Sequence, residues 1–369
     1  MRDFGYGKDT MENTIEEEID NLFQHIDSHW LDTPLDVSRF FNISALASLW
    51  RIISGEQLQL EDPKLIKLLT YNQQMISDFA DPLTTISLTS IPIYKFVESL
   101  GLLSVVENIS NIFKYCDEFI EIEKEKATDG DNPLTFIEAF LHKIKSTDES
   151  SHPLYGDRGI LNLQNTLLDM FVAGSDTSST TLNWGMLYMI LNPEVQQKVR
   201  DELKDNIGSR KPKMTDRNLT PYTEAVIHEI QRKSSIAAIG VFHSTTTPMK
   251  IGNFDVPSNT MIIPMLADIM HNPEYFPDPD KFDPERYLTK SEGGSMKFTP
   301  DPKVIPFGTG KRRCMGETLA RMSLYKFFAS LIQKYEISSG QDDLLQDKHS
   351  GGFVLSPNPY KMKFTKVKY

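Results

Sequence analysis

Residues Phe307 to Gly316 read FGTGKRRCMG, and this ten-residue stretch decides the fold. Cys314 follows a glycine-rich turn and directly follows three cations, Lys311 to Arg313, at the start of an apolar helical pattern. A helix N-terminus and cationic neighbours both lower the pKa of a thiol. Glycines let backbone amides approach a sulfur closely, and such hydrogen bonds tune a bound metal. The stretch therefore predicts a thiolate at Cys314, although a lone cysteine is more often a small buried hydrophobe.

Two other interpretations of this loop fail on their residues. A phosphate-binding loop requires glycine where Ile305 stands and serine or threonine where Arg312 follows Lys311. A zinc or thioredoxin-like site requires a second cysteine nearby, whereas the other cysteine of the chain is Cys116.

The bulk composition limits the partners and the compartment. The chain has 369 residues and a formal net charge of -12, which argues against a nucleic-acid partner. Two cysteines form no disulfide framework, so a reducing compartment is expected. The polar opening shows no secretory signal. The longest apolar helical stretch, about 161–191, contains Asp169 and Asp176, so we expect no transmembrane anchor in this chain.

The hydrophobic pattern predicts a mainly α-helical fold with a minor β region near the C-terminus. Apolar residues recur at three- and four-residue spacing from about 12 to 148. Further helices are expected at about 161–191, 193–206, 221–233 and 315–335, and short strands after His243. Length alone suggests two or three domains, although a single large domain can reach this size.

The middle of the longest predicted helix has an unusual composition. Gly174 is followed by Ser, Asp, Thr, Ser, Ser, Thr and Thr, which compete for backbone hydrogen bonds. Such a conflict between local propensity and periodicity often marks a functional site.

The cysteine loop resembles the signature of the cytochrome P450 family, F-x-x-G-x-R-x-C-x-G. It matches at Phe307, Gly310, Arg312, Cys314 and Gly316, and Gly308 lies within the same loop. The resemblance implies the P450 fold and haem b (iron protoporphyrin IX) bound in this loop, with Cys314 as the axial iron ligand.

The unusual helix resembles the central-helix motif of the same family. By resemblance, Ala173 and Gly174 lie beside the haem, where the glycine leaves a groove for dioxygen. Asp176 and Thr177 would help deliver protons, because O–O cleavage requires them inside a mostly apolar pocket. A Ser/Thr-rich kink in a core helix is the alternative.

Three further elements complete the resemblance. Glu229 and Arg232 match E-x-x-R, and Arg286 in the PERY segment would join them in a structural network; the alternative is a surface ion pair. Arg312 and His243 match positions that contact haem propionates. The residue before His243 is Phe242, where relatives commonly have proline, so His243 could also be an ordinary strand residue.

Outside these motifs, His25 and His29 have the spacing of a two-histidine metal site, but a solvated helix face is the expected interpretation.

The resemblance extends over residues 1–369, as one partial P450 domain similar to animal microsomal family 2 proteins. The opening residues resemble a segment well inside those proteins. We therefore expect the membrane anchor, the first helices and the first sheet strands to be absent. Relatives lie on the cytosolic face of the endoplasmic reticulum, and a chain without an anchor could be cytoplasmic.

The resemblance implies a monooxygenase that inserts one oxygen atom of O2 into a small apolar substrate, as in xenobiotic metabolism. Electrons would come from NADPH-cytochrome P450 reductase, with cytochrome b5 as a second partner. Two alternatives stay open: a truncated haem-binding or partner-binding remnant without turnover, and a fragment that folds poorly.

Overall fold

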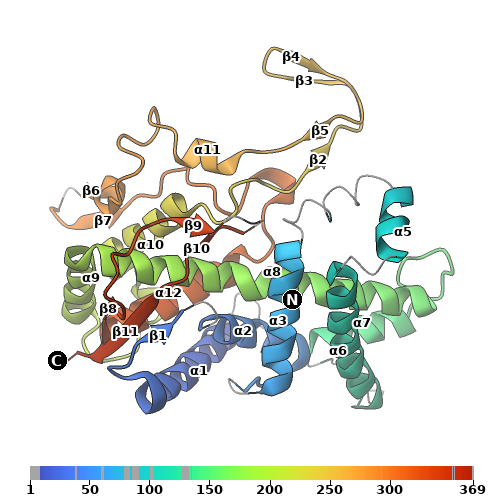
Figure 1. The fold of residues 1–369 in the computed structure, drawn as a ribbon, viewed down its shortest axis with the longest axis horizontal. Coiled ribbons are helices and arrows are strands. Elements are labelled where there is room, and N and C mark those ends of the chain that lie inside the picture. The colour runs from blue at the N-terminus through green and yellow to red at the C-terminus, as the bar shows by residue number, and fades with distance from the viewer. Residues whose placement is uncertain are drawn as a thin grey trace.

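The computed structural model describes residues 9–37, 40–59, 62–78, 84, 91–99, 104–126, 133, 135–291, 293–350, 352 and 354–367. The chain is mainly helical with small antiparallel sheets, which confirms the predicted fold class (Figure 1).

The first half of the chain is almost entirely helical, as its periodicity predicts. The last turn of α1 continues into a π-helical turn, η2. The helices are α1 (Asp9–His25), η2 (Ile26–Trp30), α2 (Asn42–Ser54), α3 (Pro63–Asp78), α5 (Ile91–Ser99), α6 (Ser104–Lys126) and α7 (Phe136–Lys145).

The longest helix, α8 (Gly156–Leu191), begins about five residues earlier than the sequence pattern predicts and crosses the middle of the molecule (Figure 1). The three other predicted helices are confirmed within one or two residues at each end. The second half contains α9 (Pro193–Asn206), η3 (Met214–Leu219), α10 (Pro221–Ser234), α11 (Leu266–Met270), η4 (Pro284–Tyr287), η5 (Gly310–Arg312) and α12 (Glu317–Lys334).

Within the described residues, the strands form five small antiparallel sheets. They are β1 (Leu35–Asp36), β2 (His243–Ser244), β3 (Met249–Ile251), β4 (Phe254–Val256), β5 (Met261–Ile262), β6 (Leu288–Lys290), β7 (Met296–Phe298), β8 (Tyr335–Ser339), β9 (His349–Ser350), β10 (Ser356–Pro357) and β11 (Lys361–Lys366). One sheet has the order β1-β11-β8, and the others are the pairs β9–β10, β2–β5, β3–β4 and β6–β7.

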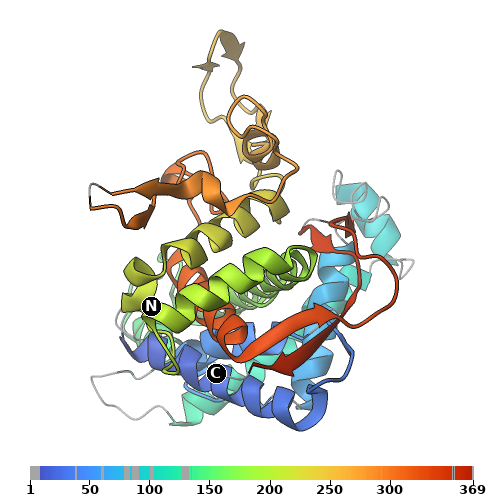
Figure 2. The same ribbon diagram turned by 90° about the vertical axis from the view of Figure 1, so that its left-hand side faces the viewer.

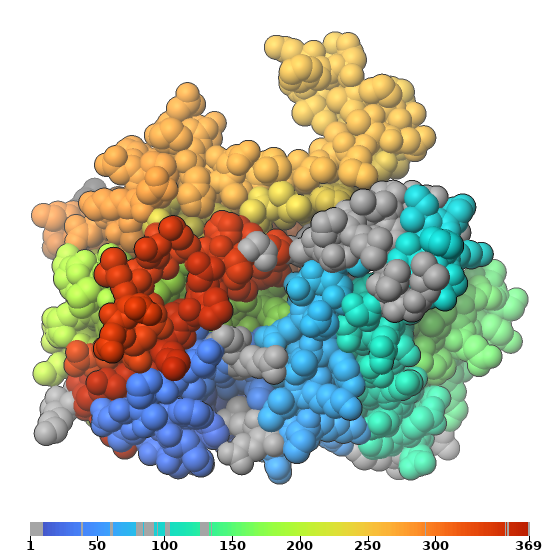
Figure 3. All heavy atoms as spheres, viewed as in Figure 1, coloured from blue at the N-terminus to red at the C-terminus, as the bar shows by residue number. Residues whose placement is uncertain are grey.

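Strand β1 was not predicted. Leu35 pairs with Met362, so the N-terminal helical half and the C-terminal strands share one sheet. A two-residue strand is too short to show the alternating pattern on which a prediction depends. The β3–β4 hairpin projects from the body in both ribbon views (Figure 2) and stands out on the molecular surface (Figure 3).

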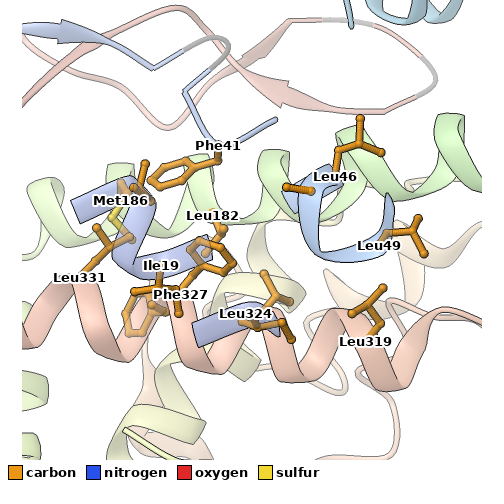
Figure 4. Close-up of a cluster of buried hydrophobic side chains, with 14 of the residues drawn as sticks. Ile19, Phe41, Leu46, Leu49, Leu182, Met186, Leu319, Leu324, Phe327 and Leu331 are labelled. Atoms are coloured by element: carbon orange, nitrogen blue, oxygen red, sulfur yellow. The ribbon is translucent and has the colours of Figure 1, made fainter. Parts of the chain in front are cut away.

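The main hydrophobic core lies where α1, α2, α8 and α12 pack against one another. Figure 4 shows Ile19 of α1, Leu182 of α8 and Phe327 of α12 close together between the helices, and Leu46 of α2 belongs to the same buried cluster. These side chains are almost completely buried. Because α12 directly follows the cysteine loop, this core fixes one end of that loop.

Candidate functional site

The cysteine loop is shaped by two glycines with positive φ. Gly308 has φ +68° and Gly310 has φ +71°, values that side chains with a Cβ rarely adopt. The backbone N–H of Cys314 donates to the Phe307 carbonyl at 2.9 Å, which closes the turn. Helix α12 begins at Glu317, so Cys314 lies three residues before its first turn.

Side chains of α12 hold the loop at two points before the cysteine. The Arg321 guanidinium lies 5.0 Å from the centroid of the Phe307 ring, and its Nε donates to Glu317 Oε1 at 2.8 Å. The Nη2 of Arg313 donates to the same oxygen at 2.6 Å. Burial alone would raise the pKa of Glu317, but the hydrogen bonds from Arg313 and Arg321 outweigh it and lower that pKa. Glu317 is therefore shared by two guanidinium groups, and the three side chains together keep a positive charge.

The two cysteines have opposite environments. Cys314 is exposed and Cys116 is buried, and both are free thiols. Burial raises the pKa of Cys116 to about 12, so the buried-hydrophobe interpretation applies to Cys116 and is wrong for Cys314.

An open depression of about 420 Å³ lies beside Cys314. Its lining residues come from η3, the cysteine loop and α12, and none comes from α8. The surface on this side of the sulfur is therefore accessible to a second molecule or segment.

Arg312 and His243 are both exposed. Neither side chain makes a hydrogen bond or ion pair with another residue in the described ranges. His243 lies in β2, where its backbone pairs with Ile262 of β5. Both side chains can therefore receive an anionic group such as a carboxylate, although no direct contact joins either of them to Cys314 in those ranges.

The central segment of α8 separates its predicted site residues onto different faces. Ala173 is exposed and Thr177 is partly exposed, and the Thr177 hydroxyl donates to the Ala173 carbonyl at 2.8 Å. Residues four apart lie on the same side of a helix, so these two share one accessible face.

Asp176 lies about 100° around the helix from Thr177, on a buried side, and is 8% exposed. Its Oδ1 accepts from Asn42 Nδ2 of α2 at 2.5 Å, and its Oδ2 accepts from Asn72 Nδ2 of α3 at 3.1 Å. Burial raises the pKa of Asp176 to about 6, against the opposing effect of the Asn42 hydrogen bond. The acid of the predicted proton relay thus contacts two amides, and among the described residues no hydrogen bond joins its carboxylate to the Thr177 hydroxyl.

Gly174 faces α2. A Cβ built on Gly174 would overlap Cδ2 of Leu49, a side chain that is only 6% exposed. The missing side chain therefore lets α2 and α8 approach closely. Leu49 occupies the side on which the resemblance implied a groove.

Glu229 and Arg232 form a completely buried pair in α10. The Glu229 carboxylate accepts from Arg232 Nε at 2.7 Å and from Arg232 Nη2 at 2.8 Å, and both side chains are 0% exposed. Arg286 Nε lies 3.4 Å from the same carboxylate. The surface ion pair considered as an alternative is therefore wrong.

Sequence reasoning missed the hydroxyl of Tyr287, which donates to Glu229 at 2.7 Å. The sequence signal for this contact was the tyrosine of PERY, which stands where the family motif has phenylalanine. Only tyrosine carries a hydroxyl group that can donate to Glu229. It also missed Asn42 and Asn72, whose partner Asp176 is more than 100 positions away along the chain.

The histidine pair gains no support as a metal site. His29 is exposed, and its ring centroid lies 4.7 Å from that of His25. No group of three or more His, Cys, Asp or Glu in the described part of the chain could hold a metal ion. None of the described helices has the length and apolarity needed to cross a membrane.

Comparisons with known proteins agree with the motifs. A family model described as Cytochrome P450 matches residues 1–364. Cytochrome P450 2B2 of Rattus norvegicus is 33% identical over 377 residues, which cover 99% of this chain and 73% of that protein. Cytochrome P450 2C8 of Homo sapiens is 30% identical over a match that covers 100% of this chain and 74% of that protein. Cytochrome P450 2H1 of Gallus gallus is 30% identical, with coverages of 99% and 72%. This chain therefore belongs to the cytochrome P450 family of monooxygenases.

Proposed function

We propose that this chain binds haem b through Cys314 and inserts one oxygen atom of O2 into a small apolar substrate. The observation that carries the proposal is the cysteine loop: an exposed, free thiol at the end of a glycine-shaped turn that Arg321 and Glu317 of α12 hold in place.

The residues of the loop and of β2 fit a haem. Cys314 Sγ would hold the iron, and Arg312 and His243, exposed side chains without a partner in the described ranges, would take the propionates. A thiolate-held haem supplies dioxygen reduction and oxygen insertion, since the cofactor carries the hard chemistry. The protein then has to orient the substrate, deliver protons and exclude competing reactions.

Thr177 and Asp176 are the residues that we propose deliver protons. The Thr177 hydroxyl lies on the accessible face of α8 and can exchange its Ala173 carbonyl partner for a molecule bound there. Asp176, next in the chain, has a pKa of about 6 and can therefore give or take a proton near neutral pH. Ala173 is a small, exposed side chain on the same face as Thr177 and leaves that face open, whereas Gly174 packs against Leu49.

The buried network around Glu229 has a structural role in this proposal. Arg232 donates to the carbonyls of Met270 and Pro279 at 2.9 and 2.8 Å, so α10 is fixed to the long connection that leads to the cysteine loop. Arg286 makes the same kind of contact with the carbonyl of Pro277 at 3.0 Å.

Apolar and basic surfaces support the proposed substrate and partners. Val241 and Phe242, directly before His243, are 74% and 52% exposed, as expected of residues that contact an apolar molecule. Lys311 and Arg313 are exposed cations on the cysteine side, suited to an acidic NADPH-cytochrome P450 reductase or cytochrome b5. We place the protein, as one P450 domain, at the cytosolic face of the endoplasmic reticulum by analogy with family 2 relatives.

The test is the absorption spectrum of the reduced, carbon monoxide-bound protein, produced as the full chain and supplied with haemin. We expect a red-shifted thiolate band that disappears in Cys314→Ala and persists in the matched variant Cys116→Ala. A band that survives Cys314→Ala would refute the ligand assignment. Turnover is then tested with 18O2, NADPH, a reductase and a medium-chain fatty acid, which should gain one labelled oxygen. A thiolate band without labelled product from this fatty acid or from an alkoxy-substituted aromatic would favour the haem-binding remnant instead.

A further inference from the structure

The buried carboxylate of Asp176 joins three helices. Asn42 of α2 and Asn72 of α3 each donate to one of its oxygens, and Asp176 itself belongs to α8. In Figure 1, α3 crosses α8 in front of this region. Asn72 is 0% exposed, so its amide has no access to water with which to exchange partners.

The amide of Asn72 has an uneven set of contacts. Its Nδ2 donates to Ser175 Oγ at 2.8 Å and to Asp176 Oδ2 at 3.1 Å. Its Oδ1 is buried and has no hydrogen-bond partner among the described residues. Since the terminal torsion of asparagine is roughly two-fold, a half-turn places the oxygen where the nitrogen now lies.

That half-turn would reverse both hydrogen bonds without moving any helix. A carbonyl oxygen has two lone pairs, so Oδ1 could accept from the Ser175 hydroxyl and from a protonated Asp176 at once. In the present orientation, Nδ2 donates to a carboxylate and to the oxygen of a hydroxyl. The same side chain can therefore satisfy Asp176 with its proton or without it.

We propose that Asn72 is a positioning residue that holds Asp176 in one place through both of its protonation states by rotating its amide. The benefit for proton delivery rests on the proposed function, in which Asp176 has to gain and lose a proton repeatedly. A lysine or arginine at this position could only donate, and would favour the carboxylate alone.

Three charged side chains on helices packed against α8 have partners other than Asp176. Arg51 of α2 pairs with Glu17. Asp78 of α3 accepts from Ser104 and Asn108, and Asp117 of α6 accepts from Gln164 of α8. The pKa of Asp176 is therefore raised by burial, against the hydrogen bond from Asn42.

The first experiment is an NMR titration of the full chain without haem, labelled with 15N-asparagine and 13C-aspartate. The side-chain amide of Asn72 and the carboxyl carbon of Asp176 should titrate with a common midpoint, and Asp176→Asn should abolish the shift of the amide. An Asn72 amide that stays constant while Asp176 titrates would overturn the proposal.

The second experiment uses infrared difference spectra, with Asp176→Asn as the reference that isolates the Asp176 bands. In Asn72→Leu, the carboxylate band and the protonated C=O band should both shift, since one form loses a donor and the other an acceptor. A shift of the carboxylate band alone would show a simple donor and overturn the proposal. Asn108→Leu is the matched control, because Asn108 is a buried amide that donates to Asp78 at 3.2 Å, and it should shift neither band.

Turnover supplies the last readout. With haem, reductase and the fatty acid, the ratio of peroxide to hydroxylated product should rise about tenfold in Asn72→Leu, the effect of losing one hydrogen bond to an ionised group. In Asn108→Leu this ratio should stay at the wild-type value. Unchanged coupling in Asn72→Leu would contradict the consequence drawn for the relay. If the chain shows no thiolate band at all, the proposed function fails, yet the two haem-free titrations still decide the role of Asn72.

Discussion

Replacing Glu229 by glutamine should strongly destabilise the protein. The substitution keeps the size of the side chain and removes its charge. Arg232 then remains 0% exposed without its ionic partner. Glu229 also accepts from the Asp283 backbone at 3.0 Å and from the Tyr287 hydroxyl, and the new NH2 group would face one of these donors or Arg232.

The magnitude follows from burial. Removing one partner of a buried ion pair costs about 3–5 kcal/mol, because an uncompensated charge is left in the interior. Here two carbonyls, of Met270 and Pro279, still accept from Arg232, so we expect the lower end, about 3 kcal/mol. An exposed i,i+3 pair is worth at most about 0.5 kcal/mol.

The assay is urea unfolding of the full chain, followed by helical circular dichroism at pH 7. Glu121→Gln is the matched control, since Glu121 pairs with Lys124 at 2.6 Å in the same spacing but is 65% exposed. The double variant Glu229→Leu/Arg232→Met should lose less stability than Glu229→Gln, because no buried charge is left alone. A loss below about 1 kcal/mol for Glu229→Gln would refute this view of the network.

Four further predictions concern single side chains. Gly174→Ala should reduce the free energy of unfolding by about 1–3 kcal/mol, because the added methyl group would overlap Leu49. In a Leu49→Ala background the same substitution should cost less in urea unfolding; an equal cost in both backgrounds would contradict the contact. His228 and Asp176 act in opposite directions over the same pH range, so each effect is measured as the difference between the protein and its variant. Burial lowers the pKa of His228 to about 4, so this group alone should reduce stability by about 3 kcal/mol as the pH drops from about 6.5 to 4, and His228→Gln should remove that contribution. Burial raises the pKa of Asp176 to about 6, so this group alone should reduce stability by about 3 kcal/mol as the pH rises from about 4 to 6; a pH profile unchanged in Asp176→Asn would disprove this. Thr177→Ala should keep haem binding and divert electrons to peroxide, and unchanged coupling would exclude the hydroxyl from proton delivery.

Local sequence signals predicted the elements whose causes are local. Helices 193–206 and 221–234 begin at a proline that follows a polar residue, and the structure has them where the pattern placed them. The cysteine loop was found because its glycines and its cysteine are fixed by backbone conformation and chemistry within ten residues.

What the sequence could not show depends on partners that lie far apart along the chain. Nothing near Asp176 indicates that Asn42 and Asn72 would reach it from two other helices. The pairing of Leu35 with Met362 has the same origin, because only the folded core brings those two segments together. Gly174 was recognised as unusual, but its contact with Leu49 required the packing of α2 on α8.

The most direct test of the account is X-ray absorption at the iron edge of the haem-loaded chain. With Cys314 in place, the spectrum should show one sulfur bound to iron, at about 2.3 Å or slightly less, a typical metal–thiolate distance. The sulfur should be lost in Cys314→Ala and kept in Cys116→Ala. Iron with only nitrogen and oxygen neighbours in the unmodified chain would contradict the assignment of Cys314 as the ligand.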